Sequence, residues 1–245
     1  MSSRADLRVL TLNLQQGRPR SSFNRGLAQI AALTPDVVLV QEADQGTLRS
    51  GREDHVELIA RACGLKEHAF LPGRSTWATV LPLCRPRATG LGDRGTGIGI
   101  ASRFPAEWHT HHLKTNRPLG RIRNMHVDMD QPRQVLAGSL DLVGTTVTVA
   151  TTHLSWHDGV GVDQLRQAET FLNTLPGPVI LGGDFNLRKN ESMWPSLVSG
   201  RTYPAHRPRF QLDYIVSELK ASRTAIHRFA FSDHRGVLAD ITIPD

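Results

Sequence analysis

The most informative stretch of the chain reads Pro178-Val179-Ile180-Leu181-Gly182-Gly183-Asp184-Phe185-Asn186. Its apolar half, bounded by proline and glycine, is typical of a short buried strand. That strand delivers Asp184 and Asn186, two positions apart, at its C-terminal end. Residues two apart on an extended chain point the same way, so we expect both side chains to face one spot. A carboxylate there can take a proton from water, while a carboxamide can orient that water or donate to an oxyanion.

Other strand-like runs end in polar residues that suit the same chemistry. Polar groups of this kind are rarely buried without a partner or a metal. Their recurrence at strand ends is therefore difficult to explain by core hydrogen bonding and favours a catalytic site. In chain order these residues are Asn13, Glu42, His153, the pair Asp184 and Asn186, Asp213 at the start of a strand, and the pair Asp233 and His234.

Taken in this order, the motifs resemble those of the endonuclease/exonuclease/phosphatase superfamily, which includes deoxyribonuclease I. They span residues 7–242, nearly the whole chain. The resemblance implies a four-layer α/β/β/α sandwich, in which two mixed β-sheets are flanked by helices. The matching pieces are Thr11-Leu12-Asn13, Val40-Gln41-Glu42, Gly97 to Pro105, Thr152-His153-Leu154, Gly183-Asp184-Phe185-Asn186, Leu212-Asp213-Tyr214 and Ser232-Asp233-His234.

The alternation of apolar patterns predicts the same α/β class without the resemblance. A length of 245 residues is typical of one domain, which we place at residues 1–245. Segments 72–94, 109–123 and 200–211 are interpreted as irregular loops, where binding specificity usually resides. Helices are predicted over 23–33, 54–63 and 162–175. Strands are predicted over 7–13, 36–41, 96–101, 108–114, 124–129, 134–142, 145–151, 178–182, 212–216, 223–230 and 236–242.

Glu42 is the best candidate for a metal ligand. Hard divalent cations such as Mg²⁺ prefer oxygen ligands and retain several waters, so one or two carboxylates suffice. The resemblance implies Mg²⁺ or Mn²⁺ at Glu42, with Asn13 and Asp233 close by. A buried salt bridge is the alternative role for Glu42.

The resemblance also implies roles for the remaining polar residues. Asp184 and Asn186 would orient and activate the attacking water. His234 would contact the scissile phosphate as a proton donor or as a charged stabiliser, with Asp213 bonded to its other ring nitrogen. His153 would lie on the opposite side of the phosphate. Because residues 95–102 contain no Asp or Glu to pair with His153, it can be a phosphate binder rather than a general acid.

Three further residues are candidates for binding substrate. Arg133 precedes a predicted strand and can hold a substrate phosphate, although a solvent-facing arginine is an equal alternative. Trp156 can line the substrate cleft and Tyr203 can stack on bases, and packing under a loop is the alternative for both. Gln167, on the helix after His153, is expected to form a structural hydrogen bond near the site.

His109 and His111 fall on one face of a predicted strand, which suggests a transition-metal site. Without an evident third ligand, a solvent-facing strand is the favoured interpretation. Cys63 and Cys84 have no metal-type or redox spacing and are interpreted as free thiols of a reducing cytoplasm. No secretory signal and no apolar run near the ~20 residues of a membrane span are present, which favours a cytoplasmic location without membrane insertion.

A net charge of +6 favours polyanionic partners, although the predominance of arginine can also reflect genome composition. The leading hypothesis is a metal-dependent phosphodiesterase that uses in-line water attack, with nucleic acid as the favoured substrate. One alternative is a phosphoesterase acting on a lipid headgroup or a small phosphorylated metabolite. Another is an inactive binding module, which the presence of Glu42, Asp184, Asn186 and His234 disfavours. Nothing in the chain suggests an obligate protein partner, and we expect a monomer.

Overall fold

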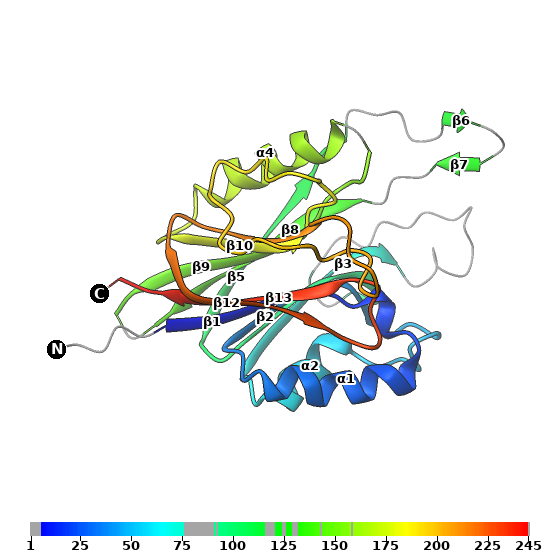
Figure 1. Cartoon of the computed structure of the whole chain (residues 1–245), viewed down its shortest axis with the longest axis horizontal. Helices are drawn as coiled ribbons and strands as arrows, with labels where there is room; N and C mark the ends of the chain where they lie inside the picture. Colours follow the sequence, from blue (N-terminus) through cyan, green and yellow to red (C-terminus); the bar gives the residue numbers. More distant parts are fainter. Residues whose placement is uncertain are drawn as a thin grey trace.

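The computed structural model of the chain describes residues 6–75, 91, 93–115, 121–123, 126–128, 132–142, 144–157 and 159–244. Two β-sheets lie face to face at its centre (Figure 1). Helices α1 (Arg20–Ala32) and α2 (His55–Cys63) cover the outer face of one sheet, and α4 (Val160–Leu172) covers the other. The expected four-layer α/β/β/α sandwich is therefore confirmed.

The first sheet has six strands in the order β12-β13-β1-β2-β4-β3. Only β1 and β2 run parallel, because α1 forms the crossover between them. The strands are β1 (Asp6–Asn13), β2 (Val37–Gln45), β3 (Glu67–Ser75), β4 (Gly95–Ser102), β12 (Lys220–Arg228) and β13 (Arg235–Thr242).

The second sheet has five strands in the order β11-β10-β9-β8-β5. Here β9 and β10 are the parallel pair, with α4 as their crossover. The strands are β5 (Ala106–Leu113), β8 (Arg133–Asp141), β9 (Thr146–His153), β10 (Val179–Asp184) and β11 (Asp213–Val216). A separate two-stranded ladder pairs β6 (Arg121–Arg123) with β7 (His126–Asp128).

The interface between the sheets is almost entirely apolar, with alternate residues of both inner faces forming one core. A buried polar contact of Gln41 crosses it close to the site. The Gln41 side-chain amide donates to the hydroxyls of Thr11, 3.1 Å away, and Thr151, 2.9 Å away. This contact joins β1 and β2 to β9, and because all three groups are fully buried it fixes how the sheets meet.

The helices begin and end where local chemistry dictates. Asp54 accepts hydrogen bonds from the backbone N–H groups of Val56 and Glu57 and so caps the N-terminus of α2. Gly64 ends the same helix in the left-handed conformation. In the part of the chain that the structure describes, no helix is both long and apolar enough to cross a membrane.

Two sequence predictions differ from the structure or extend beyond it. Strand β3 was not predicted. Residues 72–75, which were predicted to belong to a loop, form the end of this strand. Pro72 and Gly73 broke the strand pattern, and the register of β3 against β4 shifts there. The predicted strand 124–129 lies partly outside the described residues, which include only β7 of that stretch.

Candidate active site

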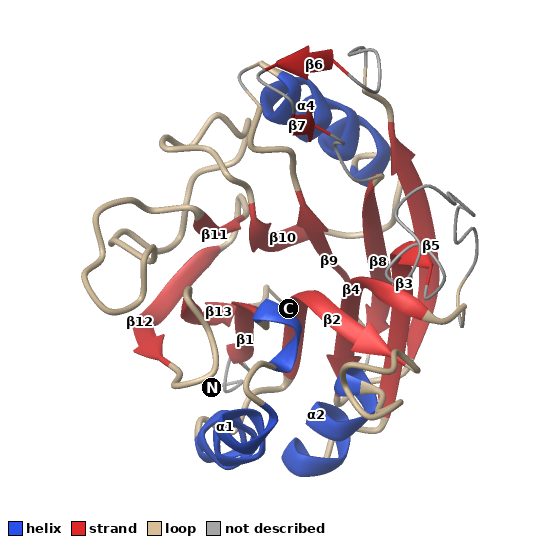
Figure 2. Cartoon of the chain, turned by 90° about the vertical axis from the view of Figure 1, so that its right-hand side faces the viewer, coloured by secondary structure: helices blue, strands red, loops and turns tan. Residues whose placement is uncertain are grey.

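The polar strand ends meet at one edge of the sandwich, which faces the viewer in Figure 2. Asn13 and Glu42 come from β1 and β2 of the first sheet. In the second sheet, Asp184 is paired in register with His153 on one side and Asp213 on the other. The C-terminal ends of parallel strands lie at the same edge, so the topology brings these side chains together.

Asp184 lies at the centre of the group. Its Oδ2 atom accepts a hydrogen bond from the side-chain amide of Asn13 at 3.1 Å, across the two sheets. The Nε2 atoms of His153 and His234 lie 3.5 and 3.7 Å from the same oxygen. Burial raises the pKa of Asp184 to about 7, although the positive charge of His234 acts in the opposite direction.

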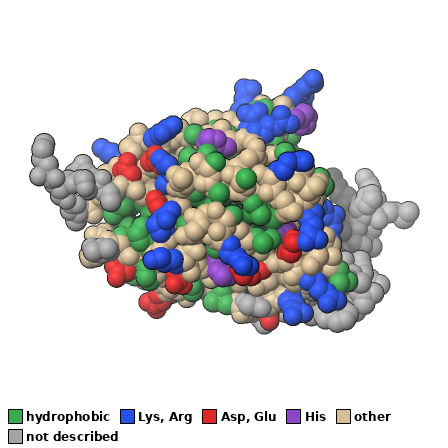
Figure 3. Space-filling view, turned by 90° about the horizontal axis from the view of Figure 1, so that it is seen from below, with side chains coloured by type: hydrophobic (Ala, Val, Ile, Leu, Met, Phe, Trp, Pro, Cys, Tyr) green, Lys and Arg blue, Asp and Glu red, His purple; other side chains and the backbone are tan. Residues whose placement is uncertain are grey.

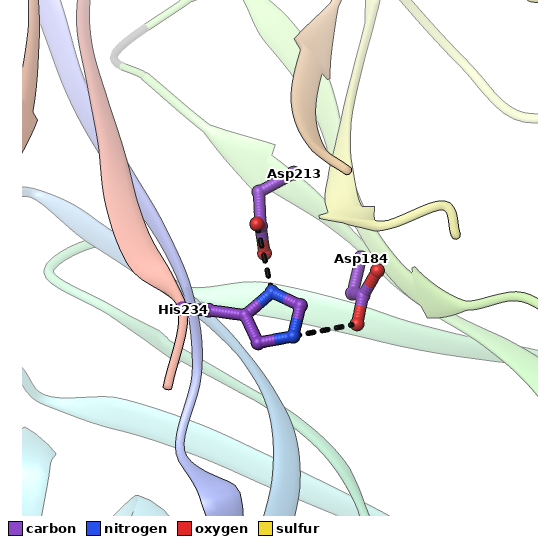
Figure 4. A group of neighbouring side chains, drawn as sticks. All are labelled: Asp184, Asp213 and His234. Carbon is purple, nitrogen blue, oxygen red and sulfur yellow. Dashed lines mark hydrogen bonds and ion pairs between the residues drawn. The ribbon is translucent and has the colours of Figure 1, made fainter. Parts of the chain in front are cut away.

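His234 is held by Asp213, as expected from the resemblance. Its Nδ1 atom lies 2.9 Å from Oδ2 of Asp213, and its Nε2 atom faces Asp184 (Figure 4). Burial alone would lower the pKa of His234, but the charges of Asp213 and Asp184 and the hydrogen bond to Asp213 together raise it to about 10. The imidazole is therefore protonated at neutral pH, and the ring of Tyr203 packs against it at 4.8 Å.

Asn186 does not lie on an extended chain, so the premise that it points with Asp184 is wrong. Strand β10 ends at Asp184, and Asn186 adopts a left-handed conformation with φ of 53°. Its backbone N–H donates to Oδ1 of Asp184 at 3.0 Å, while its side-chain amide donates to the carbonyl of Leu154. Asn186 therefore orients Asp184 and ties the end of β10 to the end of β9.

Glu42 projects from an irregularity in β2. The register against β4 shifts between Val40 and Ala43, and Glu42 itself has a positive φ of 50°. Its Oε1 atom accepts from the Asn13 amide at 3.2 Å, and its Oε2 atom lies 3.4 Å from the amide of Gln16. The NH₂ group of Asn13 thus bridges the carboxylates of Glu42 and Asp184.

The side-chain carbonyl oxygen of Asn13, Oδ1, bonds elsewhere. It accepts a hydrogen bond from the backbone N–H of Gln15 at 2.9 Å. In this arrangement the amide NH₂ group of Asn13 holds the two carboxylates together, and its Oδ1 atom is not a free third oxygen ligand beside them. Asp233 lies beside His234, where its charge also raises the histidine pKa.

The donor set fits a divalent cation at Glu42. Two carboxylates converge on one amide, and burial raises the pKa of the Asp184 carboxyl. Asp184, Asp213 and His234 also offer ligand atoms within 4.8 Å of one another. That second group fits a cation less well, because a protonated imidazole cannot bind a metal and Nδ1 of His234 is already bonded to Asp213.

His153 borders a small cavity of about 30 Å³ between the two sheets. Burial and the nearby positive charges of Arg133 and His234 hold the pKa of His153 well below its usual range, so its ring is neutral. Arg133 is buried at the start of β8 and donates to the backbone carbonyl of His153 at 3.2 Å. The cavity is lined by Glu42, Gly73, Thr96, Gly97, Ile98, Pro132, Arg133, Gln134 and His153.

Several secondary predictions are now placed. His109 contacts Ser139, while His111 stacks on Phe171 of α4, so these side chains have structural contacts instead of forming a metal site or a wholly solvent-facing strand. Gln167 bonds the backbone of Lys114, at the end of β5. The glutamine that supports the loop after His153 is Gln164, which was missed: it is fully buried and accepts from the N–H of Ser155.

Trp156 and Tyr203, the aromatic candidates for substrate binding, differ in exposure. Trp156 is 61% exposed and stacks on His157, whereas Tyr203 is half-buried against His234. Thr202 directly precedes Tyr203 in the same loop. Its hydroxyl accepts from the N–H of Asp213 at 3.2 Å, and thereby helps to fix the partner of His234. Only the tertiary structure reveals that contact.

A model of the Endonuclease/Exonuclease/phosphatase family matches residues 10–234, and the chain belongs to this family. The match includes every residue of the site described above. No curated protein sequence matches the chain.

Solved structures share the fold at low sequence identity. An endonuclease/exonuclease/phosphatase family protein from Leptotrichia buccalis has 14% identity and a TM-score of 0.68, with 97% of this chain and all of that one covered. A mannosyl-6-phosphatase from Bacteroides thetaiotaomicron has 14% identity and a TM-score of 0.67, with 97% of this chain and all of that one covered. D. rerio TDP2 in complex with a single strand DNA product has 17% identity and a TM-score of 0.63, with 97% of this chain and 99% of that one covered. The family and these neighbours define a phosphoesterase fold of the hydrolase class.

Proposed function

We infer that this protein is a divalent-metal-dependent phosphodiesterase that hydrolyses nucleic acid by in-line attack of water. The observation that supports it best is the placement of two different histidines within 3.7 Å of one carboxylate oxygen of Asp184. A phosphoryl group bound over that oxygen would have a base and two hydrogen-bond donors around it.

Asp184 is suited to take the proton of the attacking water. A general base works best when its pKa is near the operating pH, and the pKa of Asp184 is about 7. The backbone N–H of Asn186 and the side-chain amide of Asn13 each fix one carboxylate oxygen, so the base has a set orientation.

His234 is suited to stabilise negative charge on the phosphoryl oxygens. It is cationic at neutral pH, and Asp213 fixes its ring so that Nε2 faces the site. Neutral His153 can donate one hydrogen bond or accept one, which fits binding of the phosphate. A divalent cation held by Glu42 would stabilise negative charge on the phosphoryl oxygens and would lower the pKa of bound water.

Nucleic acid is the favoured substrate because the chain has a net charge of +6. Arg133, Trp156 and Tyr203 remain the proposed substrate-binding residues. Arg133 supports this by its place in the cavity beside His153, and Trp156 by its exposed ring. Cleavage of a sugar phosphate is the alternative to test, since a phosphatase shares the fold.

The test compares wild-type protein with Asp184→Ala on single- and double-stranded DNA, RNA, bis(p-nitrophenyl) phosphate and mannose 6-phosphate. Each is assayed with Mg²⁺, with Mn²⁺ and with EDTA. We expect metal-dependent cleavage of a polynucleotide that the variant loses by orders of magnitude. Hydrolysis of the monoester alone would overturn the diesterase proposal, and hydrolysis of the small diester alone would overturn the choice of nucleic acid.

A further inference from the structure

The segment between β10 and β11, residues 186–211, is described throughout and borders the site (Figure 2). The ring of Tyr203 packs on His234, and the N–H of Ala205 donates to the carbonyl of Asp233 at 2.6 Å. The N–H of Arg235 donates back to the carbonyl of Thr202 at 2.9 Å. A ligand that extends from the catalytic group on this side would therefore pass over the 186–211 segment.

This segment is strongly basic and its cations have no acidic partners. It contains one acidic residue, Glu191, against five exposed cations. None of the five side chains forms a hydrogen bond or an ion pair with another residue among those that the structure describes. Their charge is thus available to an anionic ligand. The cations are Arg188, Lys189, Arg201, Arg207 and Arg209.

The face that carries α1 and α2 differs. On the face seen in Figure 3, Lys and Arg side chains lie among Asp and Glu side chains. Around α1 and α2, Arg20 pairs with Glu53, and Arg61 pairs with Glu57. The unpaired charge of the 186–211 segment is therefore not a uniform property of this basic protein.

An exposed aromatic ring lies within the basic segment. Phe210 is 36% exposed, and the guanidinium of Arg188 lies over its ring, 4.7 Å from the centroid. Exposing a large apolar ring is unfavourable unless something covers it. The guanidinium keeps five N–H donors, which can bind phosphate.

Tyr214 fixes the two halves of this stack from below. Its hydroxyl lies 3.1 Å from the carbonyl of Leu187 and 3.2 Å from that of Gln211. These carbonyls belong to the residues next to Arg188 and Phe210. Tyr214 is buried in the core, so strand β11 holds the chain on both sides of the Arg188–Phe210 pair.

We propose that the Arg188–Phe210 pair is a stacking site for an unpaired nucleobase of a single-stranded polynucleotide, with the surrounding cations binding its phosphates. This rests on the proposed function and adds the strand state of the substrate. An exposed aromatic ring can stack on the face of any base, so the site would not discriminate between base sequences. A duplex has no free base face, which is why the site favours single strands.

The test measures binding of a fluorescein-labelled oligothymidylate to the full-length Asp184→Ala protein in EDTA. Phe210→Ala and Arg188→Ala should each raise the Kd by about 5- to 150-fold, since a base–aromatic stack is worth roughly 1–3 kcal/mol. Phe210→Trp should restore the Kd. The matched control is Arg61→Ala on α2, which should leave it unchanged, and thermal unfolding shows that each variant is folded.

An abasic oligonucleotide of equal length separates stacking from charge. The abasic strand should bind the Asp184→Ala protein more weakly than oligothymidylate does, and adding Phe210→Ala should reduce its affinity little further. Adding Arg188→Ala should reduce the affinity for both ligands. Equal losses of both ligands in Phe210→Ala would overturn the stacking site, as would an unchanged Kd for oligothymidylate. If the parent binds no oligonucleotide, the site is overturned together with nucleic acid as substrate. Hydrolysis of bis(p-nitrophenyl) phosphate by the wild type still tests the diesterase separately.

Discussion

Nδ1 of His234 lies 2.9 Å from Oδ2 of Asp213, and both side chains are almost fully buried. The second oxygen of Asp213 is buried without a hydrogen-bond partner. Burying a carboxylate in this way is unfavourable unless a charged partner is present. The pair is therefore ionic, and it determines the charge at the centre of the site.

Replacing Asp213 with Asn should lower the pKa of His234 from about 10, because the charge and the hydrogen bond of Asp213 no longer oppose burial and only Asp184 and Asp233 still raise it. NMR titration of the ring protons measures this directly. Since the folded pKa is raised, the pair stabilises the fold fully below pH 6.5, and that stabilisation is lost as pH rises through 10. Asp213→Asn should therefore lower the free energy of unfolding by about 3–5 kcal/mol at pH 6 and by far less near pH 11. A deficit independent of pH would contradict the ionic pair.

Asp184→Asn should remove activity and yet stabilise the protein. The pKa of Asp184 is raised from 3.8 to about 7, so ionising it in the fold is unfavourable above pH 7 and has no cost below pH 4. At about 1.4 kcal/mol per pH unit, the gain at pH 8 without metal is a few kcal/mol at most. Urea unfolding at pH 8 and pH 4 measures the difference, with exposed Asp163→Asn as the control. A variant less stable than wild type at pH 8 would contradict the raised pKa.

Glu42→Gln should abolish stabilisation by Mg²⁺ or Mn²⁺. The amide keeps an oxygen for the Asn13 hydrogen bond but removes the negative charge. Wild-type protein at 100 times the metal Kd should gain about 2.7 kcal/mol of stability, and the variant should gain little. Thermal unfolding across a metal titration tests this, with Glu57→Gln on the exposed face of α2 as the control. An equal metal shift in both proteins would exclude Glu42 as a ligand.

Arg49→Ala should destabilise the segment that follows Glu42. The fully buried side chain of Asp44 accepts from Arg49 at 2.6 and 2.7 Å and from Thr96 at 2.7 Å. Burial would raise the pKa of Asp44, but these partners hold it below its usual range.

We expect a loss of about 3–5 kcal/mol at pH 7, because the change leaves a buried charge unpaired. The loss should shrink as pH falls below 3.8 and through the lowered pKa of Asp44 in the folded protein, where its carboxylate becomes protonated. Urea unfolding of Arg49→Ala beside Arg61→Ala, which breaks only an exposed pair, makes the comparison. Equal effects in the two variants would show that Asp44 does not need its partner.

The sequence predicted the residues of the candidate site, because strand chemistry leaves a local signature. An apolar run that ends in Asp184, His153 or Glu42 can be recognised residue by residue. The α/β sandwich followed from the same alternation together with the family motifs. The helices were also predicted, with ends displaced by up to three residues, since helix termini depend on caps and packing as well as pattern.

The tertiary structure alone decided how those residues are used. Asn186 departs from the extended chain because a left-handed turn lets its amide reach Leu154 on a neighbouring strand. The shared amide of Asn13, the support of Asp213 by Thr202 and the Arg188–Phe210 stack all join segments distant in sequence or folded back on themselves. Such contacts leave no periodic pattern, because they arise from sheet topology and loop closure. Sequence therefore specified the chemistry of the site, whereas topology specified its geometry and charge.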